Sequence, residues 1–337
     1  MKNKNGLSGL VNIGNTCYIN SCMQILSHTY ELNNILDKIN NLNDNEDKTL
    51  ITEWNDLRKM LWNENCCISP NRFIRTIHNL SREKGYIFNG YVQNDIQEYL
   101  LFVIDTFHNS IKRKVNMNIT GEVKNDNDKY ALECYKMMSE YYSNDYSDLI
   151  NVFYGIQISL LKDISNNEVL NIKPEPFFIL NLPLPNIEGH VFSLYDCLDE
   201  YCKMETLKDD NAWYNEETNK KVDVNKMLIF WKLPTVLIID LKRWSYNEIL
   251  KKNKNNIQIP FIDLNMNKYT YMKDNNVYDL YGICNHIGDM NGGHYNSYIK
   301  TFENKWYLFD DNNIINIDET KMNTNNAYCL FYRKKIK

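Results

Sequence analysis

The residue of this chain that is best suited to nucleophilic chemistry is Cys17, which follows the small and polar residues Gly14, Asn15 and Thr16. Asn and Thr are common at helix starts, and apolar residues recur at helical spacing from Ile19 onward. Cys17 is therefore predicted to lie in the first turn of a helix, where unpaired N–H groups and the helix dipole favour a thiolate. A thiolate is the nucleophilic form of cysteine, whereas most cysteines are structural core residues. This segment alone leaves both alternatives open.

A cysteine nucleophile needs a base that takes its proton and a third group that orients the base. The chain has six histidines, and His294 differs from the others because Gly292 and Gly293 precede it. Two glycines free the backbone and allow a substrate to approach closely. His294 is therefore the candidate base.

An orienting carboxylate follows from the strand pattern after His294. Residues 294–302 and 305–309 are β-prone and are separated by Glu303 and Asn304, so they are predicted to form a hairpin. The pairing of such a hairpin places Asp310 near the beginning of the His294 strand. Cys17, His294 and Asp310 can thus form a cysteine, histidine and aspartate constellation.

The elements that position these residues change in type along the chain. The first part is predicted to be helical and the part after residue 150 to be rich in strands, which is an α+β arrangement. The polar segment 112–129 is predicted to be a loop. Further helices are expected at 54–62, 73–80, 96–111, 130–142 and 193–207, and further strands at 152–161, 177–182, 228–231, 236–241, 280–284 and 328–332. No internal repeat or long linker divides the chain, so one multi-lobed unit is expected.

Composition excludes several classes of function. The formal net charge of −5 gives no reason to expect a nucleic-acid or membrane partner. The nine cysteines are odd in number and contain no C-x-x-C pair, which indicates free thiols in a reducing compartment. No signal peptide or long apolar run is present. We therefore expect an intracellular protein, in the cytoplasm, with the nucleus left open as an alternative.

Five segments, taken in order, resemble the motifs of the ubiquitin-specific protease family of deubiquitinases. The cysteine box of that family is similar to the segment with Asn12, Gly14, Asn15, Thr16, Cys17, Tyr18, Asn20, Ser21 and Gln24. Its histidine box is similar to residues 282–298, continued by Trp306, Phe309, Asp310 and Asp311. Its other motifs resemble residues 93–100, 233–244 and 327–332. Several ordered motifs that span nearly the whole chain are much more specific than any one of them.

The resemblance implies a papain-like cysteine protease fold with a helical thumb, a β-rich palm and β fingers. A single catalytic domain is expected over residues 6–334, with the thumb over 6–145 and the fingers and palm over 146–334. The implied activity is thiol-dependent hydrolysis of the peptide or isopeptide bond after the C-terminal glycine of ubiquitin, through a thioester on Cys17. The implied partners are ubiquitin and ubiquitinated proteins, and a monomer is expected.

The resemblance also implies roles for individual residues. Cys17 matches the nucleophile, His294 the base, Asp310 the orienting carboxylate and Asn12 the donor of the oxyanion hole, with Asp311 as a second acidic residue close to the oxyanion. Asp95 matches a residue that contacts the basic ubiquitin tail. The other positions that match the substrate channel are Gln93, Glu98, His286, Gly292, Gly293 and Tyr295, and His286 with residues 288–291 matches a mobile loop that borders it.

The chain departs from the family at the zinc site that many members carry. The four expected cysteine positions are occupied by Asp163, Asn166, Asn215 and Thr218, and tetrahedral thiolate zinc is therefore not expected. Neither a metal nor another cofactor is expected. Three alternatives to a deubiquitinase remain to be distinguished: a protease for another ubiquitin-like modifier, a catalytically silent ubiquitin-binding module, and an unrelated cysteine enzyme such as a transglutaminase.

Overall fold

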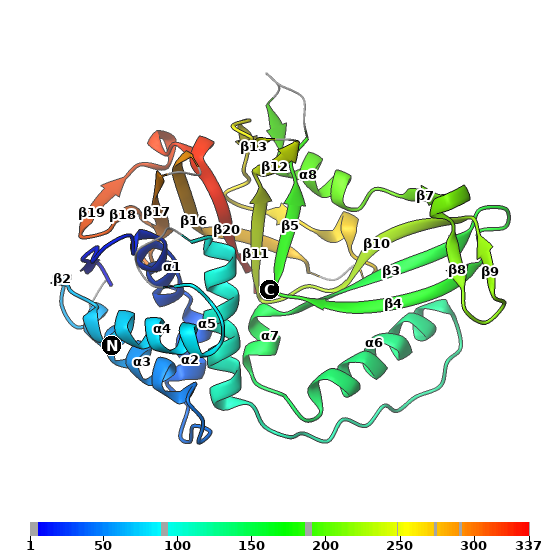
Figure 1. Cartoon of the computed structure of the whole chain (residues 1–337), viewed down its shortest axis with the longest axis horizontal. Coiled ribbons are helices and arrows are strands. Elements are labelled where there is room, and N and C mark those ends of the chain that lie inside the picture. The colour runs from blue at the N-terminus through cyan, green and yellow to red at the C-terminus, as the bar shows by residue number, and fades with distance from the viewer. Residues whose placement is uncertain are drawn as a thin grey trace.

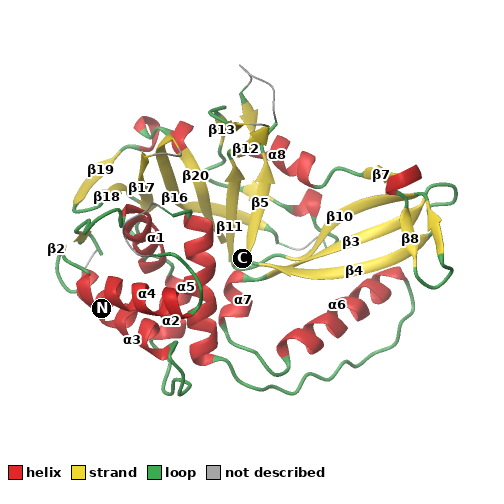
Figure 2. Cartoon of the chain, viewed as in Figure 1, coloured by secondary structure: helices red, strands yellow, loops and turns green. Residues whose placement is uncertain are grey.

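The computed structural model of the chain describes residues 6–88, 94–185, 191–247, 249–272, 275–289 and 292–336. Helices dominate the first part of the chain and strands the second, which confirms the predicted α+β arrangement (Figure 1, Figure 2). The helices of the first part gather on one side of the molecule. They are α1 (Cys17–Ser27), α2 (Tyr30–Leu36), α3 (Lys48–Leu61), α4 (Asn71–Glu83) and α5 (Ile96–Ile111).

The main sheet lies beside this helical part. Its strand order is β19-β18-β17-β16-β20-β11-β5, and β15 (Leu264–Asn265) pairs with β16. All of these neighbours are antiparallel except β11 and β5, which are parallel. In the order of the sheet, the strands are Asn313–Ile317, Trp306–Asp310, Gly292–Lys300, Val277–Asp289, Ala327–Lys334, Val236–Lys242 and Ile179–Pro183.

A second sheet extends away from the main sheet at the far side of the molecule (Figure 1). Its order is β4-β3-β10-β7, formed by Val169–Phe177, Gly155–Asp163, Val224–Lys232 and Glu205–Leu207. Helix α6 (Asp126–Tyr142) packs against it, with Cys134 and Met137 in contact with the apolar side chains of β3. The hairpin of β8 (Trp213–Asn215) and β9 (Lys220–Val222) lies at its tip.

Smaller elements connect these parts. Helix α7 (Leu149–Phe153) leads into the second sheet, and α8 (Leu194–Tyr201) follows the short strand β6 (Phe192–Ser193), which pairs with β14 (Ile257–Gln258). Strands β12 (Trp244–Asn247) and β13 (Ile249–Lys252) form a hairpin after β11. The 3-10 helices are η1 (Asp209–Asn211), η2 (Asn267–Tyr269), η3 (Glu319–Lys321) and η4 (Thr324–Asn326).

The main sheet has apolar side chains on both faces because successive residues of a strand point to opposite sides. In β11, Ile238 belongs to the core that the sheet shares with α1 and α5, whereas Leu237 and Ile239 belong to the core on the other face with α8. A strand covered on both faces is therefore continuously apolar, as the sequence of β11 is. None of the described helices combines the length and apolarity that a membrane span requires.

Helix α1 is the element most enclosed by the rest of the chain. All of its residues are buried, and it packs against β16, β17 and β18 on one side and α5 on another. The helical spacing of apolar residues from Ile19 onward would bury one face only, but strands from the C-terminal part cover the polar side as well. Asn20 and Gln24 are consequently buried, with hydrogen bonds from their side-chain amides to protein acceptors.

Most of the other predicted elements exist with shifted ends. The helix expected at 193–207 ends at Tyr201, because residues 205–207 form β7 and pair with β10. The strand expected from residue 152 begins at Gly155, after α7. The β8–β9 hairpin, β4 and β19 are further strands that the sequence did not predict. The hairpin of β17 and β18 is confirmed, but its turn is one residue longer than predicted: it is formed by residues 302–304, with Asn304 at φ 59°.

Candidate active site

Cys17 is the first residue of α1, as the sequence predicts. The turn before it has a left-handed backbone at Gly14 (φ 97°) and Asn15 (φ 47°), conformations that Gly and Asn adopt most readily. The side-chain oxygen of Asn12 closes this turn by accepting hydrogen bonds from the backbone N–H groups of Gly14 and Thr16, both at 3.2 Å. Cys17 is only 2% exposed, so little water competes for its thiol.

His294 lies between Cys17 and Asp310. Its Nε2 is 2.5 Å from Oδ1 of Asp310, and its ring also hydrogen-bonds the side chain of Cys17. Because Nε2 faces the carboxylate, Nδ1 is the nitrogen left for the sulfur. The register of the hairpin explains this approach, although it differs by one residue from the predicted one: Phe309 pairs with Ser297, which brings Asp310 to the end of the strand where His294 lies.

The electrostatics of His294 suit an ion pair with a thiolate. The hydrogen bond to Cys17, assisted by the bond to Asp310, raises the pKa of His294 to about 9 against the opposing effect of burial. A histidine with this pKa is protonated at neutral pH. An imidazolium can donate a charge-assisted hydrogen bond to negative charge that develops on the neighbouring sulfur.

Asp311 fixes the turn before Cys17 to the sheet. Its Oδ2 accepts a hydrogen bond from Nδ2 of Asn12 at 2.9 Å, and its Oδ1 accepts one from Nδ2 of Asn20 at 2.8 Å. Its backbone carbonyl accepts a further bond from the N–H of Leu10 at 2.9 Å. Asp311 adopts φ 51°, a left-handed conformation, in the turn that reverses the chain direction between β18 and β19. Both of its carboxylate oxygens therefore orient asparagines of the Cys17 segment.

Asn12 presents its side-chain amide in the turn that leads into Cys17. It is exposed, and one of the two N–H groups of its side-chain amide donates to Asp311, so the other can donate to a reacting group. The bonds to Asp311, Gly14 and Thr16 fix the orientation of this amide. A donor that is oriented before the reaction stabilises developing charge without having to reorganise.

Among the residues predicted to contact substrate, Asp95 already has two partners. Its Oδ1 caps α5 by accepting from the N–H of Gln97 at 2.7 Å, and its Oδ2 accepts a hydrogen bond from the hydroxyl of Tyr328. Tyr295 is buried close to Tyr328, with ring centroids 6.3 Å apart. Glu98 is exposed in the first turn of α5, and Gln93 lies outside the described residues.

His286 does not lie in a loop, contrary to the expectation from the sequence. It is a buried residue of β16 that pairs with Tyr295 of β17. The ammonium of Lys252 lies 2.8 Å from its Nδ1, and burial together with this charge lowers the pKa of His286 to about 4. Gly288 continues the same strand at φ 105°, and residues 290–291 of the expected mobile loop lie outside the described residues.

The glycines before His294 have different surroundings. A Cβ added at Gly293 would lie 2.3 Å from Nε2 of His286 and 2.9 Å from the carbonyl oxygen of Ile287, so only glycine fits without movement. A Cβ added at Gly292 would meet nothing within 4 Å. Gly293 is therefore required for packing in this structure, whereas Gly292 leaves open space beside the site.

Two residues near the site, Asn20 and Lys252, have contacts that the sequence did not predict. Asn20 was recognised only as part of a motif, and its buried position facing Asp311 shows why an amide stands there. Lys252 lies in a lysine- and asparagine-rich segment that resembled an ordinary surface loop. No local pattern distinguishes it from its exposed neighbours, because its environment is formed by β16, far along the chain.

The four positions that would carry zinc ligands in many relatives form turns. Asp163 accepts a hydrogen bond from the N–H of Ser165 at 2.7 Å, and Asn215 accepts bonds from the N–H groups of Glu217 and Thr218 at 2.9 and 3.2 Å. Within the described ranges, the grouping of potential metal ligands is His294, Asp310 and Asp311. These three side chains are held by Cys17, Asn12 and Asn20, and the absence of a structural metal stays a prediction.

Comparison with known proteins agrees with the geometry of the site. The family model described as ubiquitin carboxyl-terminal hydrolase matches residues 8–332. The ubiquitin carboxyl-terminal hydrolase Usp2 of Drosophila melanogaster is 31% identical over 98% of this chain and 35% of its own length. Human ubiquitin carboxyl-terminal hydrolase 2 is 28% identical over 98% of this chain and 56% of its own length. The chain thus spans about a third to a half of the length of these relatives.

A solved structure shares the fold over the whole chain. The SAGA Ubp8/Sgf11/Sus1/Sgf73 DUB module bound to ubiquitin aldehyde contains a chain that matches with a TM-score of 0.77 and 25% identity, over 100% of this chain and 71% of the other. The arrangement of helices, main sheet and extended second sheet is therefore the papain-like fold with thumb, palm and fingers. The predicted fold class is confirmed.

Proposed function

The chain belongs to the ubiquitin carboxyl-terminal hydrolase family, and we propose on this basis that it is a thiol-dependent deubiquitinating enzyme. The proposed reaction is hydrolysis of the peptide or isopeptide bond after the C-terminal glycine of ubiquitin. The observation that supports it best is the hydrogen bonding of one imidazole, that of His294, to both Cys17 and Asp310. A catalytically silent binding module would not need this complete constellation.

The first half of the proposed reaction forms a thioester. The thiolate of Cys17 attacks the carbonyl carbon of the terminal glycine, and the carbonyl oxygen becomes an oxyanion. When this intermediate collapses, the C–N bond breaks and His294 gives its proton to the leaving amine. Asp310 keeps the ring oriented and stabilises its cationic form through the bond to Nε2.

The second half returns the enzyme to its starting state. His294, now neutral, takes a proton from a water molecule that attacks the thioester carbonyl. Collapse of the second intermediate releases ubiquitin with a free carboxylate and restores the thiolate and imidazolium pair. In both halves the side-chain amide of Asn12 donates to the oxyanion, and one such donor typically contributes roughly 2.7–4 kcal/mol to lowering the barrier.

Ubiquitin is the proposed protein partner. The family name supports this assignment, as does the ubiquitin aldehyde bound in the structurally similar Ubp8 module. The tail of ubiquitin ends in two glycines, and the open space at Gly292 suits a narrow chain without side chains. The carboxylates of Asp95 and Glu98 are proposed to face the basic residues of that tail. We further propose that the protein is a monomer and that it acts inside the cell, in the cytoplasm or the nucleus.

The test is covalent capture by ubiquitin that carries an electrophile at its C-terminus. The folded protein is expected to form one adduct at Cys17, identified by peptide mass spectrometry, and Cys17→Ala is expected to form none while retaining ubiquitin binding. Cys22, which is fully buried on α1, provides a matched control, since Cys22→Ala leaves the reacting thiol in place. Failure of the folded protein to form the adduct would contradict the proposal. Preferential reaction with a probe made from another ubiquitin-like modifier would reassign the substrate.

A further inference from the structure

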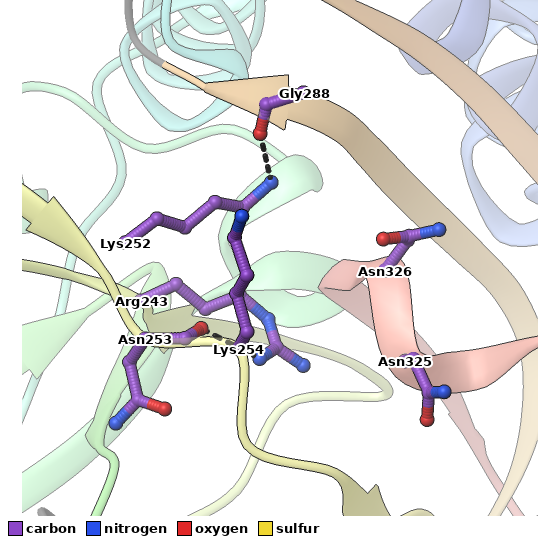
Figure 3. Close-up of a pocket in the computed structure, with 7 residues that line it drawn as sticks. All are labelled: Arg243, Lys252, Asn253, Lys254, Gly288, Asn325 and Asn326. Atoms are coloured by element: carbon purple, nitrogen blue, oxygen red, sulfur yellow. Dashed lines mark hydrogen bonds between the residues drawn. The ribbon is translucent and has the colours of Figure 1, made fainter.

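A polar pocket of about 260 Å³ lies between the segment that follows β13, the end of β16 and η4 (Figure 3). Its wall is formed by the end of β11, the residues that follow β13, Gly288 of β16 and the 3-10 helix η4. Three cationic side chains line it, namely Arg243, Lys252 and Lys254, and the described lining includes no carboxylate. The pocket is separate from Cys17, His294 and Asp310, none of which lines it.

Arg243 is almost completely buried, yet one of its nitrogen atoms lacks a partner among the residues that the structure describes. Its Nε donates to the carbonyl oxygen of Ala327 at 2.6 Å, and its Nη1 donates to the carbonyl oxygens of Asn253 and Asn255 at 3.1 and 3.0 Å. Its Nη2 is buried with no acceptor, although the side chain is only 1% exposed. A buried donor without an acceptor is costly, so such a group indicates a missing partner.

Lys252 is a second buried cation that no carboxylate neutralises within the described part of the chain. Its ammonium donates to the carbonyl oxygens of His286 and Gly288 at 2.7 and 3.0 Å and to Nδ1 of His286. Burial and the neighbouring charges of Arg243 and Lys254 lower the pKa of Lys252 to about 8. Burial likewise lowers the pKa of Arg243 to about 10. The three positive charges therefore repel one another across the pocket.

The remaining groups around the pocket are also suited to an anion. Lys254 extends beside Lys252, and its side chain is 74% exposed, with a loose ion pair of 3.5 Å to the exposed carboxylate of Asp289. Asn325 and Asn326 of η4 line the pocket on the side opposite the cations (Figure 3). Amide N–H groups can complete the coordination of an oxyanion that the cations attract.

We infer that this pocket binds a phosphate-class anion, either inorganic phosphate or the phosphate of a monoester. Arg243 Nη2 and the ammonium group of Lys254 bind its oxygens, Lys252 contributes its positive charge while its own donors stay on His286 and Gly288, and the amides of η4 assist. Arg and Lys are the residues that recognise phosphate most often, Arg by its planar fork and Lys as a point charge. Phosphate offers more acceptor oxygens than a carboxylate, which fits donors that converge from three different segments. This inference does not depend on the proposed catalytic activity.

Binding is tested on the protein carrying Cys17→Ala, so that catalysis plays no part. Titration with inorganic phosphate at constant ionic strength, followed by calorimetry and by the thermal midpoint, is expected to show one saturable site. The expected Kd is on the order of 0.1–1 mM, in the range of a few charge-assisted hydrogen bonds. Acetate and chloride at equal ionic strength are the comparison anions. Equal affinity for acetate would overturn the phosphate assignment, and an absence of saturable binding would overturn the site.

Variants locate the binding. Lys254→Gln is expected to weaken phosphate binding about tenfold, because it removes one charged donor from the pocket. Asn325→Asp places a negative charge at the opposite wall and is expected to weaken binding at least as much. Both residues are exposed, so the fold tolerates the changes. Lys321→Gln removes the same charge from a nearby exposed position that does not line the pocket, and it is expected to leave binding unchanged. Equal affinity in Lys254→Gln and Lys321→Gln would overturn the inference.

The source of the phosphate is distinguished by a second ligand series. O-phosphoserine and a phosphoserine peptide are compared with inorganic phosphate at the same pH and ionic strength. Tighter binding of the phosphoserine ligands, sensitive to Lys254→Gln, assigns the pocket to a phosphate monoester. Tighter binding of inorganic phosphate assigns it to the free anion.

Discussion

The side-chain amide of Asn12 donates a hydrogen bond of 2.9 Å to Oδ2 of Asp311, which lies 299 positions later in the sequence. This contact ties the turn before Cys17 to the residue next to Asp310. Cys17 and Asp310 are thus held in register by one pair of side chains. Asp311 contributes this restraint through both carboxylate oxygens, since its Oδ1 binds Asn20 inside α1.

Replacing Asp311 tests whether this restraint supports catalysis. Asp311→Asn keeps the size and tolerates the left-handed backbone, but its amide accepts from only one of the two asparagines. We expect kcat for a ubiquitin C-terminal fluorogenic substrate to fall roughly 10–100-fold, as for a weakened oxyanion donor, with little change in KM. Asn313→Asp, which alters an exposed residue in the adjacent strand, is the control. An unchanged kcat in Asp311→Asn would show that Asn12 is oriented without it.

Asp310→Asn is expected to be much less damaging than Cys17→Ala. An amide oxygen can still accept from Nε2 of His294 and orient the ring, but it no longer stabilises the imidazolium electrostatically. The pKa of His294, raised to about 9 by Cys17 and Asp310, is therefore expected to fall. The alkaline limb of the kcat/KM profile should move to lower pH, and NMR titration of the imidazole measures the same shift directly. Loss of activity as complete as in Cys17→Ala would show that the carboxylate charge is indispensable.

Stability is expected to depend on pH through His294. Its pKa is raised from 6.5 to about 9 in the folded protein, so the folded state binds the proton more tightly than the unfolded chain. The resulting stabilisation is fully present below pH 6.5 and is lost as pH rises through about 9. His294→Gln should remove this part of the alkaline loss when thermal midpoints of both proteins are compared across that window. Parallel curves for the two proteins would contradict the assigned proton affinity.

His286 is expected to act at the opposite end of the pH range. Its pKa is lowered from 6.5 to about 4 by burial and by Lys252, so the unfolded chain binds a proton that the folded protein rejects. Stability is therefore expected to fall as pH decreases below 6.5 and to keep falling until about pH 4. His286→Gln should flatten this acidic limb relative to the starting protein. An acidic limb that is identical in both proteins would show that His286 is not held neutral by Lys252.

The parts of the site that could be predicted from the sequence are those set by local patterns. Residues just before Cys17 mark a helix start, and a short turn pairs β17 with β18, within one residue of the predicted register. These two local facts suffice to bring Asp310 close to His294. The link between Cys17 and this hairpin is not local, and it was inferred from the requirements of cysteine chemistry and from the family motifs.

The features that could not be predicted depend on distant parts of the chain. Helix α1 is buried on every side because strands formed after residue 277 cover it, and no helical periodicity reveals a second cover. Residues 205–207 became a strand because β10 offered a free edge for pairing, which overrode the helical pattern. Lys252 became a buried residue because β16 supplies carbonyl oxygens for its ammonium group. Tertiary pairing decided each of these cases.

Gly292 and Gly293 are expected to be needed for different reasons. Gly293 is needed for packing, and Gly292 is expected to be needed for substrate binding. A Cβ at Gly293 would lie 2.3 Å from Nε2 of His286, so Gly293→Ala must displace the buried imidazole or the strand, which typically costs about 1–3 kcal/mol. We expect a lower thermal midpoint and reduced kcat/KM together.

A Cβ at Gly292 meets nothing within 4 Å, so the Gly292→Ala variant is expected to keep the thermal midpoint of the starting protein. If the ubiquitin tail passes over this residue, Gly292→Ala should raise KM without affecting the thermal midpoint. An unchanged KM in Gly292→Ala would show that the ubiquitin tail does not pass over this residue. An unchanged thermal midpoint in Gly293→Ala would show that the His286 imidazole can move aside without destabilising the fold.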